Sequence, residues 1–199
     1  MIIPLFPLQS VLFPGGKLPL RIFEQRYMDM AKVCLKESSS FGVCLIAHGE
    51  EVAQAGKPAA EPHAVGTLAT IADWDMPQLG VLNVGVEGGN RFRILRHWVE
   101  PSGLLRAEVE LIADPAVIPI PGDYARLVPM LRAVVAELTD LAPAKPHRFY
   151  DAGWLGMRYA EILPIPAASK QKLLEVEGSI DRLEIIYRLL QSKGMLSRD

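Results

Sequence analysis

The spacing of apolar residues changes once along the chain, near Asp114, and no other feature constrains the fold as strongly. Before this point, short apolar or alternating segments are separated by turns rich in Pro and Gly, which is typical of β-strands. After it, apolar residues recur at helical spacing. The sequence therefore predicts an α+β fold, with a β-rich part at 1–115, a linker at 116–122 and a helical part at 123–199.

Seven segments of the β-rich part have the composition of strands. They are residues 2–8, 18–23, 41–47, 65–72, 79–86, 91–99 and 105–112. The last of them alternates most regularly between apolar and polar residues, which predicts a half-buried strand. Residues 87–90 read Glu-Gly-Gly-Asn and tolerate positive φ, so we predict that they form the turn of a hairpin.

Helices are expected both among these strands and after them. One helix, residues 24–36, is inserted among the strands, and Gly49 to Pro62 is predicted to be a surface loop. The helical part contains four apolar stripes, at residues 127–138, 151–163, 170–175 and 180–192. These predict that the part after the strands is α-helical.

The charge balance and the cysteine count exclude several classes of protein. The chain has 21 basic and 23 acidic side chains, a net charge of −2 at pH 7, and so lacks the positive field typical of nucleic-acid binders. Two cysteines cannot form a secreted disulfide framework. No apolar run is long enough to span a membrane, and the proline-rich start lacks the basic leader of a signal peptide. We therefore expect a cytoplasmic protein that does not contact the membrane.

Residues that could carry chemistry are present but complete no motif. Asp73 and Asp75 would point the same way from a strand and could act as an acid–base pair, but a solvated loop is the favoured explanation. The spacing of Cys34, Cys44, His48 and His63 matches no set of metal ligands. The sequence thus predicts no enzyme, no metal site and no cofactor.

One local pattern in the sequence would suit a nucleic-acid site. Arg91 and Arg93 flank Phe92 on a predicted strand, and aromatic and basic side chains on an open sheet can hold RNA. A half-buried strand with its polar face outward explains the same pattern. RNA binding therefore stays an alternative rather than the main prediction.

The start of the chain closely resembles a known family. The residues that carry the resemblance are Ile3–Leu8, Val11–Gly16 and Leu18–Tyr27, with further matches at Val65–Ile71 and Asn90–Ile94. Together they resemble the N-terminal substrate-binding domain of the Lon ATP-dependent protease. The chain is most similar to the free-standing bacterial proteins that carry this domain without the ATPase and peptidase modules.

This resemblance implies a fold and a function. The fold would be a PUA-like, six-stranded pseudo-barrel with one inserted helix, followed by a helical bundle. The function would be that of a non-catalytic module that binds unfolded or extended polypeptides as an adaptor in protein quality control, with a protease or a chaperone as a further partner. The alternative is a PUA-like protein that binds RNA or a small molecule.

A peptide-binding surface would need exposed side chains where apolar and polar segments meet. The residues that we predict for this role are Phe13, Arg26, Tyr27, Trp74, Met76 and Leu79. Shallow apolar pockets and open strand edges both accept extended peptides with little demand on sequence.

Overall fold

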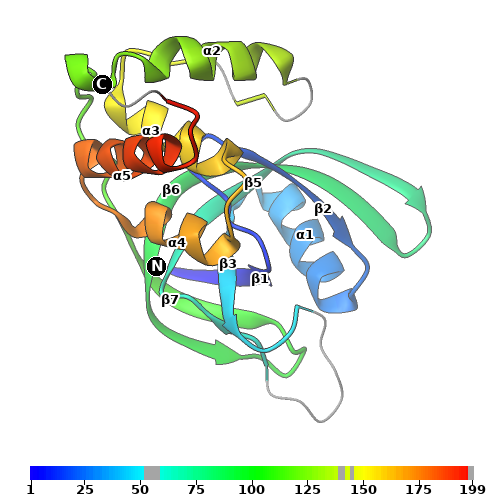
Figure 1. Cartoon of the computed structure of the whole chain (residues 1–199). Helices are drawn as coiled ribbons and strands as arrows, with labels where there is room; N and C mark the ends of the chain where they lie inside the picture. Colours follow the sequence, from blue (N-terminus) through cyan, green and yellow to red (C-terminus); the bar gives the residue numbers. More distant parts are fainter. Residues whose placement is uncertain (52–58, 139–141, 144–145, 197–199) are drawn as a thin grey trace. The chain divides into compact units, whose positions relative to one another are not determined.

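Strands form one sheet in the first part of the chain, residues Met1–Ala113 (Figure 1). The computed structural model describes residues 1–51, 59–138, 142–143 and 146–196, so half of the predicted loop Gly49 to Pro62 lies outside the described residues, and its last two residues are in a strand. The strands are β1 (Ile2–Leu8), β2 (Lys17–Ile22), β3 (Phe41–His48), β4 (Glu61–Pro62), β5 (Val65–Gln78), β6 (Val81–Val99) and β7 (Leu105–Leu111).

Five of these strands close into a ring. The order is β1, β7, β6, β5 and β3, and β1 completes the ring by pairing in parallel with β3. β2 pairs with β6 outside the ring, and the two-residue β4 pairs with β3. Six strands are therefore longer than two residues among those described. The predicted α+β fold with a barrel is confirmed.

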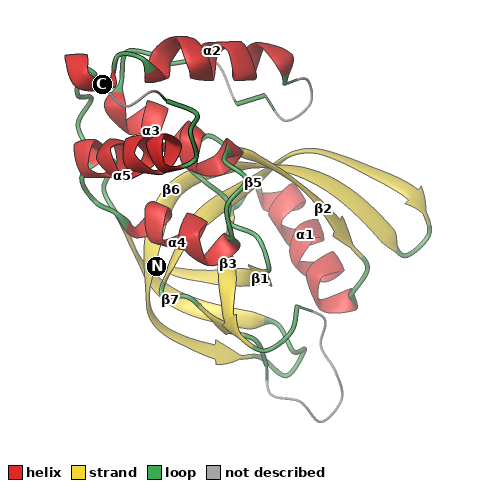
Figure 2. Cartoon of the chain, viewed as in Figure 1, coloured by secondary structure: helices red, strands yellow, loops and turns green. Residues whose placement is uncertain are grey.

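The barrel unit has two apolar cores. Ile3, Leu5 and Phe92 belong to the core enclosed by the ring. The second core forms where helix α1 (Gln25–Glu37) packs on β2, β5 and β6, and it includes Tyr27, Met30 and many other residues. Figure 2 shows α1 lying beneath the curved sheet that these strands form. Alternation along β1 explains how one strand serves both cores, since Leu5 faces one and Phe6 the other.

The predicted hairpin turn at residues 87–90 is wrong, because β6 runs through them without a break. Gly88 is needed there for a different reason. Its carbonyl accepts a hydrogen bond of 2.6 Å from the N–H of Gly15, and its N–H donates one of 2.9 Å to the carbonyl of Gly16. A Cβ on Gly88 would overlap the carbonyl oxygen of Phe13. The glycine therefore allows close approach of another backbone rather than a turn.

The true hairpin turn joins β5 and β6 at Leu79 and Gly80. Gln78 pairs with Val81, and Gly80 has φ +85°, a conformation that glycine adopts without strain. β5 is much longer than the sequence pattern indicates, because Asp73, Asp75 and Pro77 weaken the alternation without ending the strand.

Residues Asp114–Asp199 form a second compact unit, made of helices. They are the short 3₁₀ helix η1 (Gly122–Tyr124), α2 (Leu127–Glu137), α3 (Ala152–Ile162), α4 (Ala167–Glu175) and α5 (Ser179–Ser192). The Asp151 side chain caps α3 by accepting from the N–H of Gly153 at 3.0 Å. Pro129 lies in the first turn of α2, where a missing N–H costs nothing.

The segment that was predicted as a linker, 116–122, is attached to this helical unit. Ile118 accepts a backbone hydrogen bond of 2.8 Å from Ala152, and Pro119 forms an isolated bridge with Asp151. Within the described residues, no helix combines the length and apolar composition that crossing a membrane requires.

Candidate functional site

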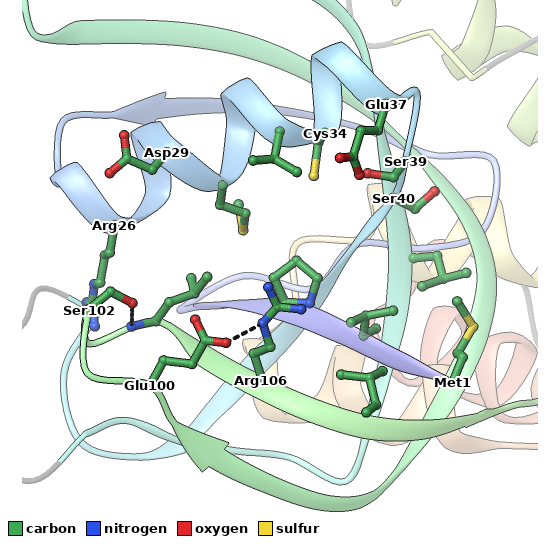
Figure 3. Close-up of a pocket in the computed structure, with 17 residues that line it drawn as sticks. Met1, Arg26, Asp29, Cys34, Glu37, Ser39, Ser40, Glu100, Ser102 and Arg106 are labelled. Atoms are coloured by element: carbon green, nitrogen blue, oxygen red, sulfur yellow. Dashed lines mark hydrogen bonds and ion pairs between the residues drawn. The ribbon is translucent and has the colours of Figure 1, made fainter.

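A pocket of about 620 Å³ lies in the barrel unit, between α1, the start of β1 and the turn that joins β6 to β7 (Figure 3). Its apolar surface comes from Ile2 and Pro4 of β1, Met30 and Val33 of α1, and Leu68 of β5. Alternation along β1 turns Ile3 and Leu5 into the barrel core and leaves Ile2 and Pro4 on the other face. α1 covers only part of that face, so Ile2 stays 55% exposed.

One end of the pocket is closed by two arginines that are already paired. Arg26 forms an ion pair of 2.9 Å with Glu24 and donates a hydrogen bond of 2.8 Å to the carbonyl of Gly103. Arg106 forms an ion pair of 2.7 Å with Glu100, drawn as a dashed line in Figure 3. The hydrogen bond from Arg26 to Gly103 links α1 to the turn between β6 and β7, and the Arg106–Glu100 pair lies within that hairpin.

The other end of the pocket is formed by the last turn of α1. Figure 3 shows the Cys34 thiol and the Glu37 carboxylate directed from the helix toward the pocket, beside Ser39 and Ser40. Burial raises the pKa of the Cys34 thiol, Ser39 lowers it by hydrogen bonding, and the nearby charge of Glu37 raises it. The thiol is therefore a neutral, nearly buried group, 4% exposed.

A second surface lies on the β5–β6 hairpin. Trp74 is 58% exposed, Met76 is 42% exposed and Leu79, at the turn, is 98% exposed. Trp74 pairs with Val84 and so shares its face of the sheet, but Val84 is buried in the core with α1. The β5–β6 hairpin therefore carries large apolar side chains that are exposed to water.

The predicted peptide-binding residues divide into two groups. Trp74, Met76 and Leu79 gather on the hairpin, whereas Phe13 is fully buried and Tyr27 is 4% exposed. The prediction that Phe13 and Tyr27 are surface contacts needs correction. The loop containing Phe13 is held against Gly88 of β6, and Tyr27 packs at 4.1 Å from the ring of Phe6.

Arg26 belongs to neither group. Its guanidinium lies 4.5 Å from the centre of the Tyr27 ring and is engaged by Glu24, so it supports the wall of the pocket. The sequence prediction missed Ile2, Val33 and Glu37, which also line the pocket. Val33 is one of several apolar residues on the predicted helix, so the sequence gives no signal that distinguishes it.

The remaining candidates for chemistry are dispersed. Cys44 is 1% exposed in β3, and burial raises the pKa of its thiol. A Cβ on Gly85 would lie 2.7 Å from an oxygen of Asp73, so this glycine makes room for the carboxylate. Arg91 is buried at 2% exposure and Arg93 is exposed, so they do not form a joint basic surface. Within the described ranges, no group of His, Cys, Asp and Glu could hold a metal ion.

The chain matches a known domain almost from end to end. The substrate-binding domain of the ATP-dependent protease La (LON) matches residues 2–192. The Lon protease of Anaeromyxobacter dehalogenans is 28% identical over 202 residues, which cover 96% of this chain and 23% of that protein. Lon protease 1 of Bdellovibrio bacteriovorus is 28% identical over 203 residues, covering 98% of this chain and 25% of that protein. The chain thus spans about a quarter of the length of the curated relatives that it matches.

Solved structures show the same relation. A Lon N-terminal domain protein from Xanthomonas campestris has a TM-score of 0.77 and 33% sequence identity, with 94% of this chain and 98% of that chain covered. The N-terminal domain of the Mycobacterium avium complex Lon protease has a TM-score of 0.63 at 18% identity, which supports the fold alone. This chain belongs to the family of Lon substrate-binding domains, and the match is to that domain rather than to an ATPase or peptidase. The predicted family is confirmed.

Proposed function

We propose that this protein binds unfolded or extended polypeptide segments, without catalysis, as an adaptor in protein quality control. Membership of the Lon substrate-binding family supports a role in recognising substrates. The observation that carries the proposal is the β5–β6 hairpin, on which Trp74, Met76 and Leu79 are 58%, 42% and 98% exposed. Large apolar side chains that are left in water on one hairpin are typical of a surface that another molecule covers.

The hairpin suits unfolded chains because contact with exposed apolar side chains requires no particular sequence in the bound segment. An unfolded segment exposes apolar side chains that a folded protein hides, and contact with the hairpin removes both surfaces from water. Each 100 Å² of apolar surface buried contributes about 2.5 kcal/mol before the cost of association. Affinity would therefore be moderate and would follow the apolar content of the segment.

The partner that acts on the bound segment would supply the chemistry. The curated relatives reported above are Lon proteases, and this chain corresponds to about a quarter of their length. We propose a cytoplasmic role in which the chain presents bound segments to a protease or a chaperone.

Binding can be tested with a reduced, carboxymethylated protein that cannot fold, and with its native form as the control ligand. We expect the unfolded form to bind and the native form not to bind, as measured by fluorescence anisotropy. We also expect the chain to slow aggregation of a heated client. Failure to distinguish the unfolded form from the native form would refute the proposed function.

The surface can be tested with matched variants. Replacing Trp74 and Leu79 with Ser should weaken binding of the unfolded ligand by about tenfold or more, since two large apolar contacts are lost. Tyr150→Ser, which changes a side chain that is 64% exposed in the helical unit, is the control and should leave binding unchanged. Equal binding by all three proteins would remove the hairpin from the site.

A further inference from the structure

The start of β1 has an unpaired strand edge beside the pocket. Met1 and Val109 exchange two backbone hydrogen bonds, each 2.8 Å long. Because such pairs alternate along an antiparallel ladder, the N–H and carbonyl of Ile2 point away from β7. On that other side, the pairing of β1 with β3 begins only at Leu5. Among the described residues, Ile2 has no strand partner on this edge.

This edge differs from the outer edge of β5. The outer edge of β5 pairs with β3 only as far as Ala69. Beyond it, β5 carries Asp73, Asp75 and Pro77, and charges or a proline on an edge oppose the addition of another strand. The β1 edge holds a proline, Pro4, but no charge, since Ile2 and Pro4 are both apolar and line the pocket. Its donor and acceptor at Ile2 are therefore suited to an added strand.

The pocket also has one carboxylate without a counterion. Arg26, Arg106 and Glu100 are paired at the far end of the pocket. Asp29 lies 3.6 Å from Lys32. Glu37 forms no ion pair with any described residue, although it lies in the last turn of α1, where the helix dipole is already negative. The carboxylate and the helix end together favour a bound cation.

We propose that the pocket binds an extended polypeptide by strand addition along Ile2, with an apolar side chain over Pro4, Val33 and Leu68 and a Lys or Arg beside Glu37. This inference rests on the proposed function, because it names the kind of segment that is bound and one place where it binds. The apolar base explains why the segment is unfolded or extended. The uncompensated charge explains why a basic residue next to the apolar one is preferred.

The test uses two labelled unstructured peptides that differ only in having Lys or Glu beside an apolar pair, and the full chain with its purification tag at the carboxyl end. We expect the Lys peptide to bind about threefold more tightly at low salt, as a partly exposed ion pair allows. Glu37→Gln should abolish the preference, and Glu37→Lys should invert it. Asp114→Asn, at an exposed acid in the helical unit, should leave it intact.

The strand edge is tested with two changes at Ile2. Ile2→Pro removes the N–H that points to the open edge and spares the hydrogen bonds to β7, so binding should weaken about fivefold. Ile2→Ala keeps the N–H and should weaken binding less than the proline does. Circular dichroism checks that both variants fold, and a chain bearing Leu5→Pro marks the signal of a broken β1.

The outcomes separate this inference from the proposed function. If the chain binds the carboxymethylated ligand but shows no preference between the peptides and no difference between Ile2→Pro and Ile2→Ala, the pocket proposal is wrong and the hairpin alone carries binding. If neither the unfolded ligand nor either peptide binds, both proposals are refuted.

Discussion

Substitution of Gly88 by Ala tests why β6 contains two adjacent glycines. An added Cβ would overlap the carbonyl oxygen of Phe13 and lie 3.0 Å from its carbonyl carbon. Both are backbone atoms and cannot rotate aside. The loop from Phe13 to Gly16 must therefore move away from β6, and the hydrogen bonds of Gly88 with Gly15 and Gly16 must lengthen or break.

The expected loss follows from these contacts. Two backbone hydrogen bonds contribute about 1 kcal/mol each. Overpacking against an immobile neighbour adds about 1–3 kcal/mol. The Gly88→Ala variant should thus have a free energy of unfolding lower by about 3–5 kcal/mol, which corresponds to a decrease in Tm of about 15 °C for a unit of this size.

The next residue provides the control. A Cβ on Gly89 would lie 3.6 Å from its nearest neighbours, both in Leu68, which is ordinary van der Waals contact. Gly89→Ala should therefore change stability by less than about 1 kcal/mol, and the smaller freedom of the unfolded chain favours a slight gain. The two substitutions are identical in chemistry and differ only in what the methyl group meets.

Urea unfolding followed by circular dichroism gives the stability, and hydrogen exchange of peptides from β2 and β6 shows where protection is lost. Exchange is needed because the chain has two units, which can unfold separately. We expect faster exchange near Gly15 and Gly88 and native exchange in α5. If Gly88→Ala were as stable as Gly89→Ala, the explanation by close backbone approach would be wrong.

Three further predictions concern buried polar groups. Arg182 is fully buried and donates hydrogen bonds to the carbonyls of Leu173 and Val176. Arg182→Ala should therefore lower the free energy of unfolding of the helical unit by about 3 kcal/mol or more, as measured by thermal unfolding. A variant as stable as the original chain would show that these carbonyls find other donors. Burial raises the pKa of Tyr27 to about 12, so the folded state favours the neutral side chain. The free energy of unfolding should therefore fall between about pH 10 and pH 12. Urea titrations should show a smaller loss over this range in Tyr27→Phe. Cys34 is 4% exposed and its pKa is raised, so alkylation by iodoacetamide should be slow in the native chain and fast in urea; rapid native labelling would mean that the pocket opens.

The sequence predicts the strands well where alternation or apolar runs are strong, as in β7 and β3. The prediction of a turn within β6 is wrong, because a Gly-Gly pair looks the same in the sequence in two cases. Gly88 and Gly89 could either turn the chain or allow a neighbouring backbone to come close. Only the tertiary contact with Phe13 distinguishes the two cases. The bulge in β6 between Ile94 and Arg96 appears in the sequence as a slip in alternation near Leu95, so irregularities within a strand can be visible.

The candidate surfaces show the same division. Trp74 and Leu79 could be predicted as exposed because they stand among charged and turn residues. Phe13 and Tyr27 have similar local surroundings, but the loop packed on β6 and the ring of Phe6 bury them. The pocket could not be predicted, because Ile2, Glu37 and Leu68 are distant in sequence and meet only after the barrel closes.

The pairing of β1 with β7 has a consequence during synthesis. Ile2 pairs with Glu108 and Leu5 pairs with Leu105, so β1 cannot complete its pairing until β7, the last strand of the barrel, has been synthesised. Until β7 has been translated, the apolar strand β1 has no neighbour on one side and only β3 can pair with it. A barrel closed by such distant partners should fold slowly for its size and finish only when the helical unit is already emerging.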